Sequence, residues 1–318
     1  MKHFFILNPA AGKGKRFEKI IEQIHTLCKE RGVDYVVHIT ERIGEATEFV
    51  KKCCKSTTER LRFYACGGDG TINETASGLI GCDNAELGVI PMGTGNDFVR
   101  NFENQEKFLD IEAQLDGEAK KIDIIRYNDK YSVNMINVGF DCEVAKQAAR
   151  NRRNVFVPSK IAFIVGVVQK FFSMPGVKAK LIIDGVEQKQ SQFQLCAIAN
   201  GSYCGGGFYA APISFLNDGT VDICTINPVT RMKLLKLVGY YKAGTYLEKK
   251  IAPDIIKYKK CSSIEMQFEE PTDISVDGEI ERVSSLTITT VRNALSFCVP
   301  KGCVMHGEKA DEPQESYV

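Results

Sequence analysis

One carboxylate stands among three glycines in the stretch ACGGDGTINETASGL, residues 65–79. The stretch joins an apolar segment typical of a strand to a segment with the spacing of a helix. Glycines at such a junction permit positive φ and let the backbone approach a ligand closely. Amides at the start of the following helix would point toward an anion, so the pattern favours phosphate binding. It is not a Walker A loop, because no GxxxxGK[ST] pattern occurs in the chain.

The carboxylate itself, Asp69, is not explained by local structure. Thr71 and Glu74 have the spacing of a capping box, which accounts for them without any ligand. A carboxylate beside bound phosphate would be repelled unless a cation, or a hydroxyl that carries a proton, lay between them. Asp69 therefore predicts metal-assisted phosphoryl transfer, in which positioning and charge neutralisation supply most of the catalysis.

Two further polar loops follow apolar segments in the same half of the chain. They are NPAAGKGK, residues 8–15, and PMGTGNDFVR, residues 91–100. Ligands of open parallel sheets bind beyond the carboxyl ends of the strands. The three loops together predict one cleft at that edge of a sheet.

The elements that would position these loops follow from hydrophobic periodicity. Before residue 120, strands at 3–7, 33–39, 61–66 and 87–91 alternate with helices at 15–31, 45–55 and 72–80. This alternation predicts a parallel sheet with helices on both faces. Beyond it, strands are predicted at 121–127, 131–138, 178–184, 192–200, 220–226, 262–268 and 284–290. Many strands separated by turn residues favour an antiparallel sandwich or barrel.

The predicted fold class is therefore α/β, with two domains. A three-layer domain with a mostly parallel sheet occupies residues 1–125, an antiparallel β-sandwich domain occupies 126–299, and the tail 300–318 is expected to pack back on the first domain. Two helical stretches, 159–176 and 231–250, interrupt the second domain. They are interpreted as core-packing helices or, alternatively, as the border of a lipid-accepting mouth at a membrane surface.

Composition narrows the class of protein. The 318 residues carry a net charge of +1, which gives no indication of nucleic-acid binding. Cys298, Cys303 and His306 lack a fourth ligand for a metal site. No apolar run approaches 18 residues, and the apolar part of the N-terminus is too short for a signal peptide. We expect a soluble protein of the reducing cytoplasm without a transmembrane segment.

Five motifs together resemble a known family. NPAAGKGK, GGDGTINE, GVIPMGTGNDFVR, DGTVD and SVDGE, spread between residue 3 and about residue 300, resemble the soluble bacterial lipid kinases of the diacylglycerol-kinase catalytic-domain family, related to sphingosine and ceramide kinases. The resemblance implies a nucleotide-binding α/β domain followed by a β-sandwich domain, with ATP in the cleft between them. It also implies a protein peripheral to the membrane that takes a lipid substrate at the membrane surface, and it leaves a homodimer open.

The resemblance implies residues for ATP and Mg²⁺. The ATP-binding residues would be Asn8, Pro9, Ala10, Ala11, Gly12, Lys13, Thr40, Gly67, Gly68, Asp69, Gly70, Thr71, Glu74, Gly93, Thr94 and Asn96. SFLNDGTVD resembles the family's structural magnesium loop, in which Asp218 would be a side-chain ligand and the carbonyls of Phe215 and Thr220 would add oxygens. Oxygen ligands suit a hard cation.

SVDGE matches the family segment that carries the proposed general base, with Asp277 and Glu279 as candidates. Taken alone, Asp277-Gly278 is typical of a hairpin turn. Beside the other motifs we prefer the catalytic interpretation, in which Asp277 accepts the proton of a lipid hydroxyl and Glu279 aids it. Asp69 then holds a catalytic Mg²⁺ through water or orients that network. Arg100 has two equal interpretations, as a phosphate contact or as the partner of Asp97.

The function that these residues favour is an ATP-dependent lipid kinase acting on diacylglycerol or a related lipid. The sequence does not identify the lipid, and phosphatidylglycerol, polyprenol and sphingoid bases are further candidate acceptors. One alternative is an NAD kinase-like phosphotransferase, which also uses GGDGT, although GTGNDF favours the lipid kinases. The other is a non-catalytic nucleotide-binding regulator, which the presence of Asp69, Asp218, Asp277 and Glu279 disfavours.

Overall fold

The first sheet is built mostly from strands whose side chains are buried on both faces. In the computed structural model, which describes residues 1–11, 17–140, 142–144, 146–147, 176–189, 192–247 and 255–307, its four parallel strands follow the order β2-β1-β3-β4. They are β1 (Lys2–Leu7), β2 (Tyr35–Ile39), β3 (Leu61–Gly67) and β4 (Ala85–Pro91). Phe4 and Ile6 face one side of β1, and Phe5 and Leu7 face the other. Both faces are therefore apolar and need a cover.

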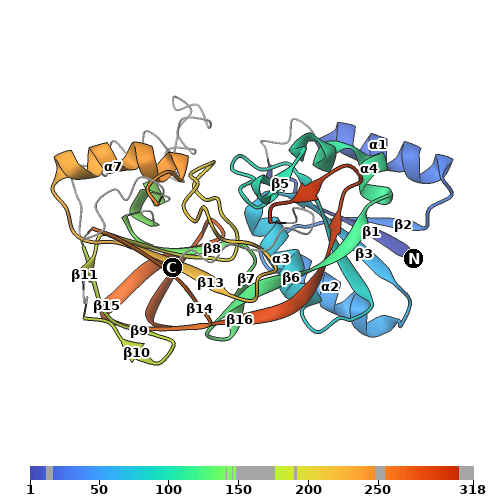
Figure 1. Ribbon diagram of the computed structural model, residues 1–318. Helices are drawn as coiled ribbons and strands as arrows, with labels where there is room; N and C mark the ends of the chain where they lie inside the picture. Colours follow the sequence, from blue (N-terminus) through green and yellow to red (C-terminus); the bar gives the residue numbers. More distant parts are fainter. Residues whose placement is uncertain are drawn as a thin grey trace.

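Helices supply that cover on both sides, as Figure 1 shows. α1 (Phe17–Glu30) and the short α4 (Ile111–Leu115) pack on the face of Phe5 and Leu7. α2 (Glu45–Ser56) and α3 (Asp69–Leu79) pack on the face of Phe4 and Ile6. The three-layer α/β arrangement expected from the sequence is confirmed.

The rest of the chain forms an antiparallel β region. Its strands are β6 (Glu118–Tyr127), β7 (Lys130–Ser132), β8 (Met135–Gly139), β9 (Val177–Ile183), β10 (Val186–Glu187), β11 (Gln192–Phe193), β12 (Leu195–Ala199), β13 (Val221–Ile226), β14 (Ile256–Cys261), β15 (Ser263–Val276) and β16 (Glu279–Val299). β8, β12, β13 and β14 pair in antiparallel order, and β15 pairs with β8, β9 and β16. The antiparallel second region expected from the sequence is also confirmed.

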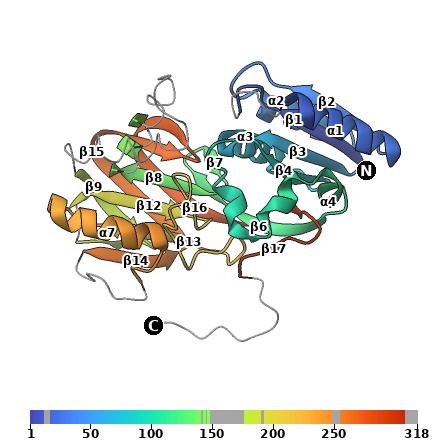
Figure 2. The same cartoon turned by 90° about the horizontal axis from the view of Figure 1, so that it is seen from above.

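β16 connects the two regions. It begins as the antiparallel partner of β15 and ends in parallel pairing with β4, where Phe297 lies opposite Leu87. β6 accompanies it in antiparallel register over much of this length, and Figures 1 and 2 show both strands running from one region into the other. After β16, β17 (Val304–Met305) pairs with β5 (Phe102–Glu103) of the first region. The chain thus returns to the first region near its end.

The bounds of two predicted strands and one predicted helix are wrong. The strand expected at 131–138 is divided into β7 and β8, and the one expected at 284–290 is part of the much longer β16. The helix expected at 72–80 begins earlier, at Asp69, with Gly68 as its N-cap and no capping side chain. The capping box is therefore wrong, because Thr71 lies inside the first turn of the helix.

The two helical stretches of the second region have different outcomes. Residues 159–175 lie outside the part of the chain that the structure describes. The other stretch contains α7 (Arg231–Ala243), which ends at Gly244 with φ 69°. α7 buries Leu234, Leu237 and Tyr241 and exposes Met232. Its inner face therefore packs as a core helix, and none of the helices among the described residues is long and apolar enough to cross a membrane.

Candidate active site

Two glycine loops at the ends of β3 and β4 pack backbone against backbone. A Cβ placed on Gly93 would lie 2.5 Å from the Cα of Gly68, which no real Cβ tolerates. The amides of Met92 and Gly93 both donate to the carbonyl oxygen of Gly67, at 2.8 and 3.2 Å. Gly67 is equally confined, because a Cβ there would lie 2.3 Å from Thr71 Oγ1. Glycine is required at these positions for close approach, and the two loops form one wall.

The first polar loop joins the same wall. Asn8 Nδ2 donates to Thr71 Oγ1 at 3.1 Å, and Asn8 Oδ1 accepts from the amide of Ala10 at 3.0 Å. Thr40, at the end of the neighbouring strand β2, is buried and donates from its amide and its Oγ1 to the carbonyl oxygen of Leu7. The ends of four parallel strands therefore meet where the sequence predicts a ligand site.

The remaining residues predicted to bind ATP are partly exposed, partly tied to a neighbouring helix and partly outside the described residues. Pro9, Ala10 and Thr94 are exposed on the loops. The carbonyl oxygen of Glu74 accepts from Thr47 Oγ1 at 2.7 Å, which ties α3 to α2. Gly12 and Lys13 lie outside the described residues.

Asp69 is the first residue of α3, and a second carboxylate lies beside it. Asp69 Oδ1 accepts from the amide of Phe98 at 3.1 Å. A Cβ placed on Gly95 would lie 3.1 Å from Asp69 Oδ2 and 3.3 Å from Asp97 Oδ2, so the two carboxylates flank this glycine. Burial and the charge of Asp97 together raise the pKa of Asp69 to about 7. Two crowded acids of this kind attract a cation or share a proton.

Asp97, which the sequence suggests only as a possible partner of Arg100, also lies at the site. Its two carboxylate oxygens accept from the amide of Gly206 in the second region, at 3.1 and 2.8 Å. Arg100 Nε lies 3.4 Å from Asp97 Oδ1, and Arg100 Nη2 donates to the carbonyl oxygen of Gly95 at 3.4 Å. Asp97 thus joins the two regions of the fold, and the ion pair expected as one interpretation of Arg100 is present.

Asp277 occupies the tip of the hairpin between β15 and β16. Val276 pairs with Glu279, which leaves the two-residue loop Asp277-Gly278 with φ 46° and 91°. Positive φ at both positions is the type I′ hairpin turn. The hairpin turn that Asp277-Gly278 suggests by itself is confirmed, and Asp277 and Glu279 do not lie along one extended strand.

The carboxylate of Asp277 is held by the break between β7 and β8. Its Oδ2 accepts from the amide of Val133 at 2.9 Å, and its Oδ1 accepts from Asn134 and Met135 at 3.1 and 2.8 Å. The residue is 7% exposed, and burial raises the pKa of this carboxyl to about 6, against the effect of the backbone donors. Asp277 therefore has a structural role, because it binds the hairpin to the start of β8.

Glu279 is the exposed first residue of β16 and reaches the phosphate-binding wall. A Cβ placed on Gly70 would lie 3.1 Å from Glu279 Oε1 and 3.7 Å from its Cγ. The side chain consequently lies against Gly70, in the first turn of α3. Glu279 thus contacts the glycine loop. Asp277 also lies near it, because its charge adds to burial and to the charge of Asp97 in raising the pKa of Asp69.

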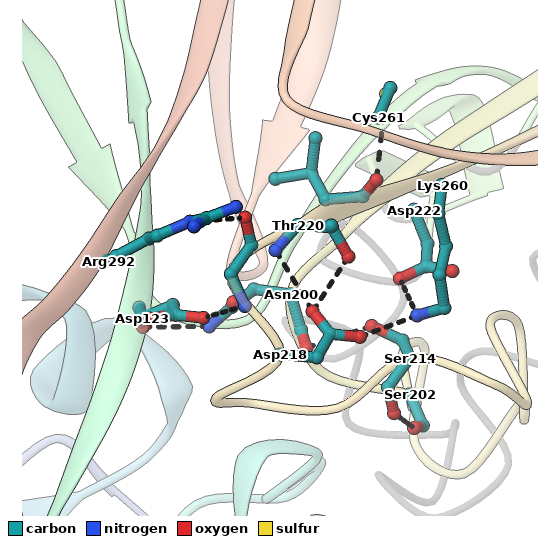
Figure 3. A network of polar contacts seen from close by, with 12 residues as sticks. Asp123, Asn200, Ser202, Ser214, Asp218, Thr220, Asp222, Lys260, Cys261 and Arg292 are labelled. Carbon is teal, nitrogen blue, oxygen red and sulfur yellow. Dashed lines mark hydrogen bonds and ion pairs between the residues drawn. The ribbon is translucent and has the colours of Figure 1, made fainter. Parts of the chain in front are cut away.

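The predicted magnesium loop lies before β13 and has partners within the protein (Figure 3). Asp218 Oδ1 accepts from the amide and Oγ1 of Thr220, at 3.0 and 2.7 Å. Asp218 Oδ2 lies 2.6 Å from Lys260 Nζ. Over the described part of the chain, no three His, Cys, Asp or Glu side chains are grouped as a metal site.

Two family models match nearly the whole chain. The model described as the diacylglycerol kinase catalytic domain matches residues 2–127. The model described as the YegS C-terminal NAD kinase beta sandwich-like domain matches residues 134–299. The division between the two models falls close to the change from parallel to antiparallel strands.

Relatives cover most of the chain at low identity. "Probable lipid kinase YegS-like" of Alcanivorax borkumensis is 26% identical over 284 residues, which are 88% of this chain and 91% of that protein. A diacylglycerol kinase of Bacillus subtilis is 26% identical over 277 residues, 86% of this chain and 88% of that protein. The crystal structure of a diacylglycerol kinase from Bacillus anthracis superposes with a TM-score of 0.66 at 21% identity, covering 93% of this chain and 96% of the other. That likeness shows a shared fold.

Proposed function

Because the chain belongs to the diacylglycerol kinase catalytic-domain family and carries the YegS-type C-terminal domain, we propose that it transfers the γ-phosphoryl group of ATP to a lipid hydroxyl. Diacylglycerol or a related lipid is the proposed acceptor, taken from the membrane surface, because the relatives of similar length are described as diacylglycerol or lipid kinases. The expected location is the cytoplasm, at the periphery of the membrane.

The observation that carries the proposal is the position of Glu279 against Gly70. It brings a carboxylate of the antiparallel region to the first turn of α3, where the glycine loop and the N-terminus of a helix suit a phosphate chain. Phosphoryl transfer needs a phosphate cradle and, on the acceptor side, a group that takes the hydroxyl proton. This boundary between the two regions offers both within one side-chain length.

The proposed ATP site is the wall formed by the three loops. The contacts described above fix the backbone of this wall before any ligand binds. They join Asn8, Gly67, Gly68, Thr71 and Gly93. Thr40 at the end of β2 extends the wall away from α3. Such preorganised amides stabilise the charge that develops on the transferred phosphoryl oxygens.

Mg²⁺ fits the neighbourhood of Asp69. Asp69 and Asp97 present two carboxylates, and Asn96 Oδ1 is buried without a hydrogen-bond donor among the described residues. Oxygen ligands of this kind suit Mg²⁺, which in nucleotide sites takes its remaining ligands from phosphates and water. Bound there, the ion would neutralise the phosphate charge. Ionised Asp69 would orient the ion and the phosphates. The positive charge of the ion would in turn favour the ionised form of Asp69, which burial and the charge of Asp97 disfavour.

The contacts favour Glu279 as the group that takes the acceptor proton. The lone pairs of Asp277 point to three backbone amides and serve the hairpin turn. Glu279 is exposed and adjacent to the loop, so it is within reach of an acceptor entering between the regions. We therefore propose Glu279 as the general base and Asp277 as the residue that positions it, which reverses the preference drawn from the sequence.

A direct competition tests the proposal. The protein is incubated with Mg²⁺ and ATP labelled at the γ-phosphate, together with either a total-lipid extract or NAD. The expected result is label in the lipid phase alone, gained roughly 10²–10⁴-fold more slowly when Glu279→Gln replaces the wild type. Label in NADP would support the NAD kinase-like alternative, and label in neither acceptor would support a nucleotide-binding regulator.

A further inference from the structure

The loop before β13 is crossed by two cationic side chains. Lys260 Nζ lies 2.6 Å from Asp218 Oδ2 and 3.1 Å from Asp222 Oδ2. Arg292 Nε donates to the carbonyl oxygen of Gly219 at 3.0 Å. Oxygens that a loop of this type could offer to a metal are thus occupied by the protein's own ammonium and guanidinium groups (Figure 3).

The position of Lys260 follows from strand register. β13 and β14 are antiparallel neighbours, and Asp222 lies directly opposite Lys260. The Asp222 side chain is 1% exposed, so its charge needs a partner close by. The ammonium also lies 5.6 Å from the centroid of the Phe215 ring, within the range of a cation–π contact. Three separate features therefore hold the lysine head group at this point.

A divalent ion does not fit beside this arrangement. Asp218 Oδ1 already accepts two hydrogen bonds from Thr220, and Oδ2 accepts the lysine at 2.6 Å. An ion bound to Oδ2 would lie next to a like charge, and like charges this close repel strongly. Expelling Lys260 instead would leave Asp222 buried without its cation.

We propose that the ammonium of Lys260 takes the place of a divalent cation in the Asp218 loop, so that folding of the second region needs no metal. Mg²⁺ would then act only with the nucleotide. The inference concerns stability in the absence of ATP and lipid, so it stands or falls separately from the kinase proposal.

Thermal unfolding of the full chain, without nucleotide, tests the inference. Wild-type protein is expected to give the same melting temperature in EDTA and in millimolar Mg²⁺. Lys260→Met retains the length of the side chain and removes its charge, so it is expected to lower the melting temperature by about 5 °C or more. Lys259→Met is the matched control on the same strand, because the ion pair that Lys259 makes among the described residues is an exposed one, with Asp184 at 3.7 Å. It is expected to shift melting by about 1 °C or less.

Metal content gives a second measurement that does not depend on the variant melting well. After dialysis against Mg²⁺ or Ca²⁺, wild type and Asp218→Asn are expected to retain the same amount of metal per chain, because Asp218 binds none. A melting temperature that rises with metal in wild type but not in Asp218→Asn, or metal that is lost in Asp218→Asn, would overturn the inference. Unchanged melting of Lys260→Met would also overturn it.

Discussion

Replacing Asp277 by asparagine should cost stability first, because the structure gives its carboxylate three backbone donors at 2.8 to 3.1 Å. In Asp277→Asn, the amide oxygen can still accept from Asn134 and Met135, but the NH₂ group then faces the amide of Val133. Two donors in contact leave one buried N–H unsatisfied, and the charge that strengthened the other two bonds is lost. Each effect costs about 1–2 kcal/mol, or about 2–4 kcal/mol in total.

The assay compares this variant with Glu279→Gln, whose side chain is exposed. Unfolding in urea or by heat is expected to show the loss for Asp277→Asn, as a fall in melting temperature of at least about 4 °C, and almost none for Glu279→Gln. Steady-state transfer to lipid at saturating ATP should fall by roughly 10²–10⁴-fold in Glu279→Gln, since a positioned base is removed. An Asp277→Asn protein that melts like wild type but is inactive, beside an active Glu279→Gln, would refute the reasoning and make Asp277 the base.

Two further predictions follow from the first region. Gly93→Ala should abolish ATP-dependent transfer and lower stability, because its Cβ would lie 2.5 Å from the Cα of Gly68. Gly81→Ala is the control for adding a Cβ, because Gly81 has open space around it. The positive φ of Gly81 will cost this control some stability of its own. The pKa of Asp69 is raised to about 7, so the folded state binds more protons than the unfolded state. Without Mg²⁺, the free energy of unfolding should therefore fall as pH rises from about 4 through 7. Asp69→Asn should flatten this part of the profile, and an identical slope in both proteins would contradict the assignment.

The sequence predicts those parts of the site that depend on residue type in one short segment. Gly67 and Gly68 are interpretable as a phosphate loop because glycine lets the backbone approach its neighbours closely, and the structure shows this through the contact with Gly93. The capping box failed for a local reason. α3 begins at Asp69, so Thr71 uses its hydroxyl to accept from Asn8 instead of capping the helix.

Interactions between distant strands could not be predicted in the same way. The donors to Asp277 come from residues 133–135, where a strand predicted as continuous is broken, and no local pattern marks that break. Lys260 meets Asp218 only because β13 and β14 pair in one particular register. Asp97 was visible in the GTGNDF motif, but its place beside Asp69 depends on the packing of two loops around Gly95.

The most direct test of the central claim is mass spectrometry of a total-lipid extract after incubation with the protein, Mg²⁺ and ATP. The account predicts that one lipid class gains the mass of a single phosphoryl group, with ADP formed in equal amount, and that both changes are roughly 10²–10⁴-fold slower with Glu279→Gln. ATP that remains intact, or ADP formed without any phosphorylated lipid, would contradict it.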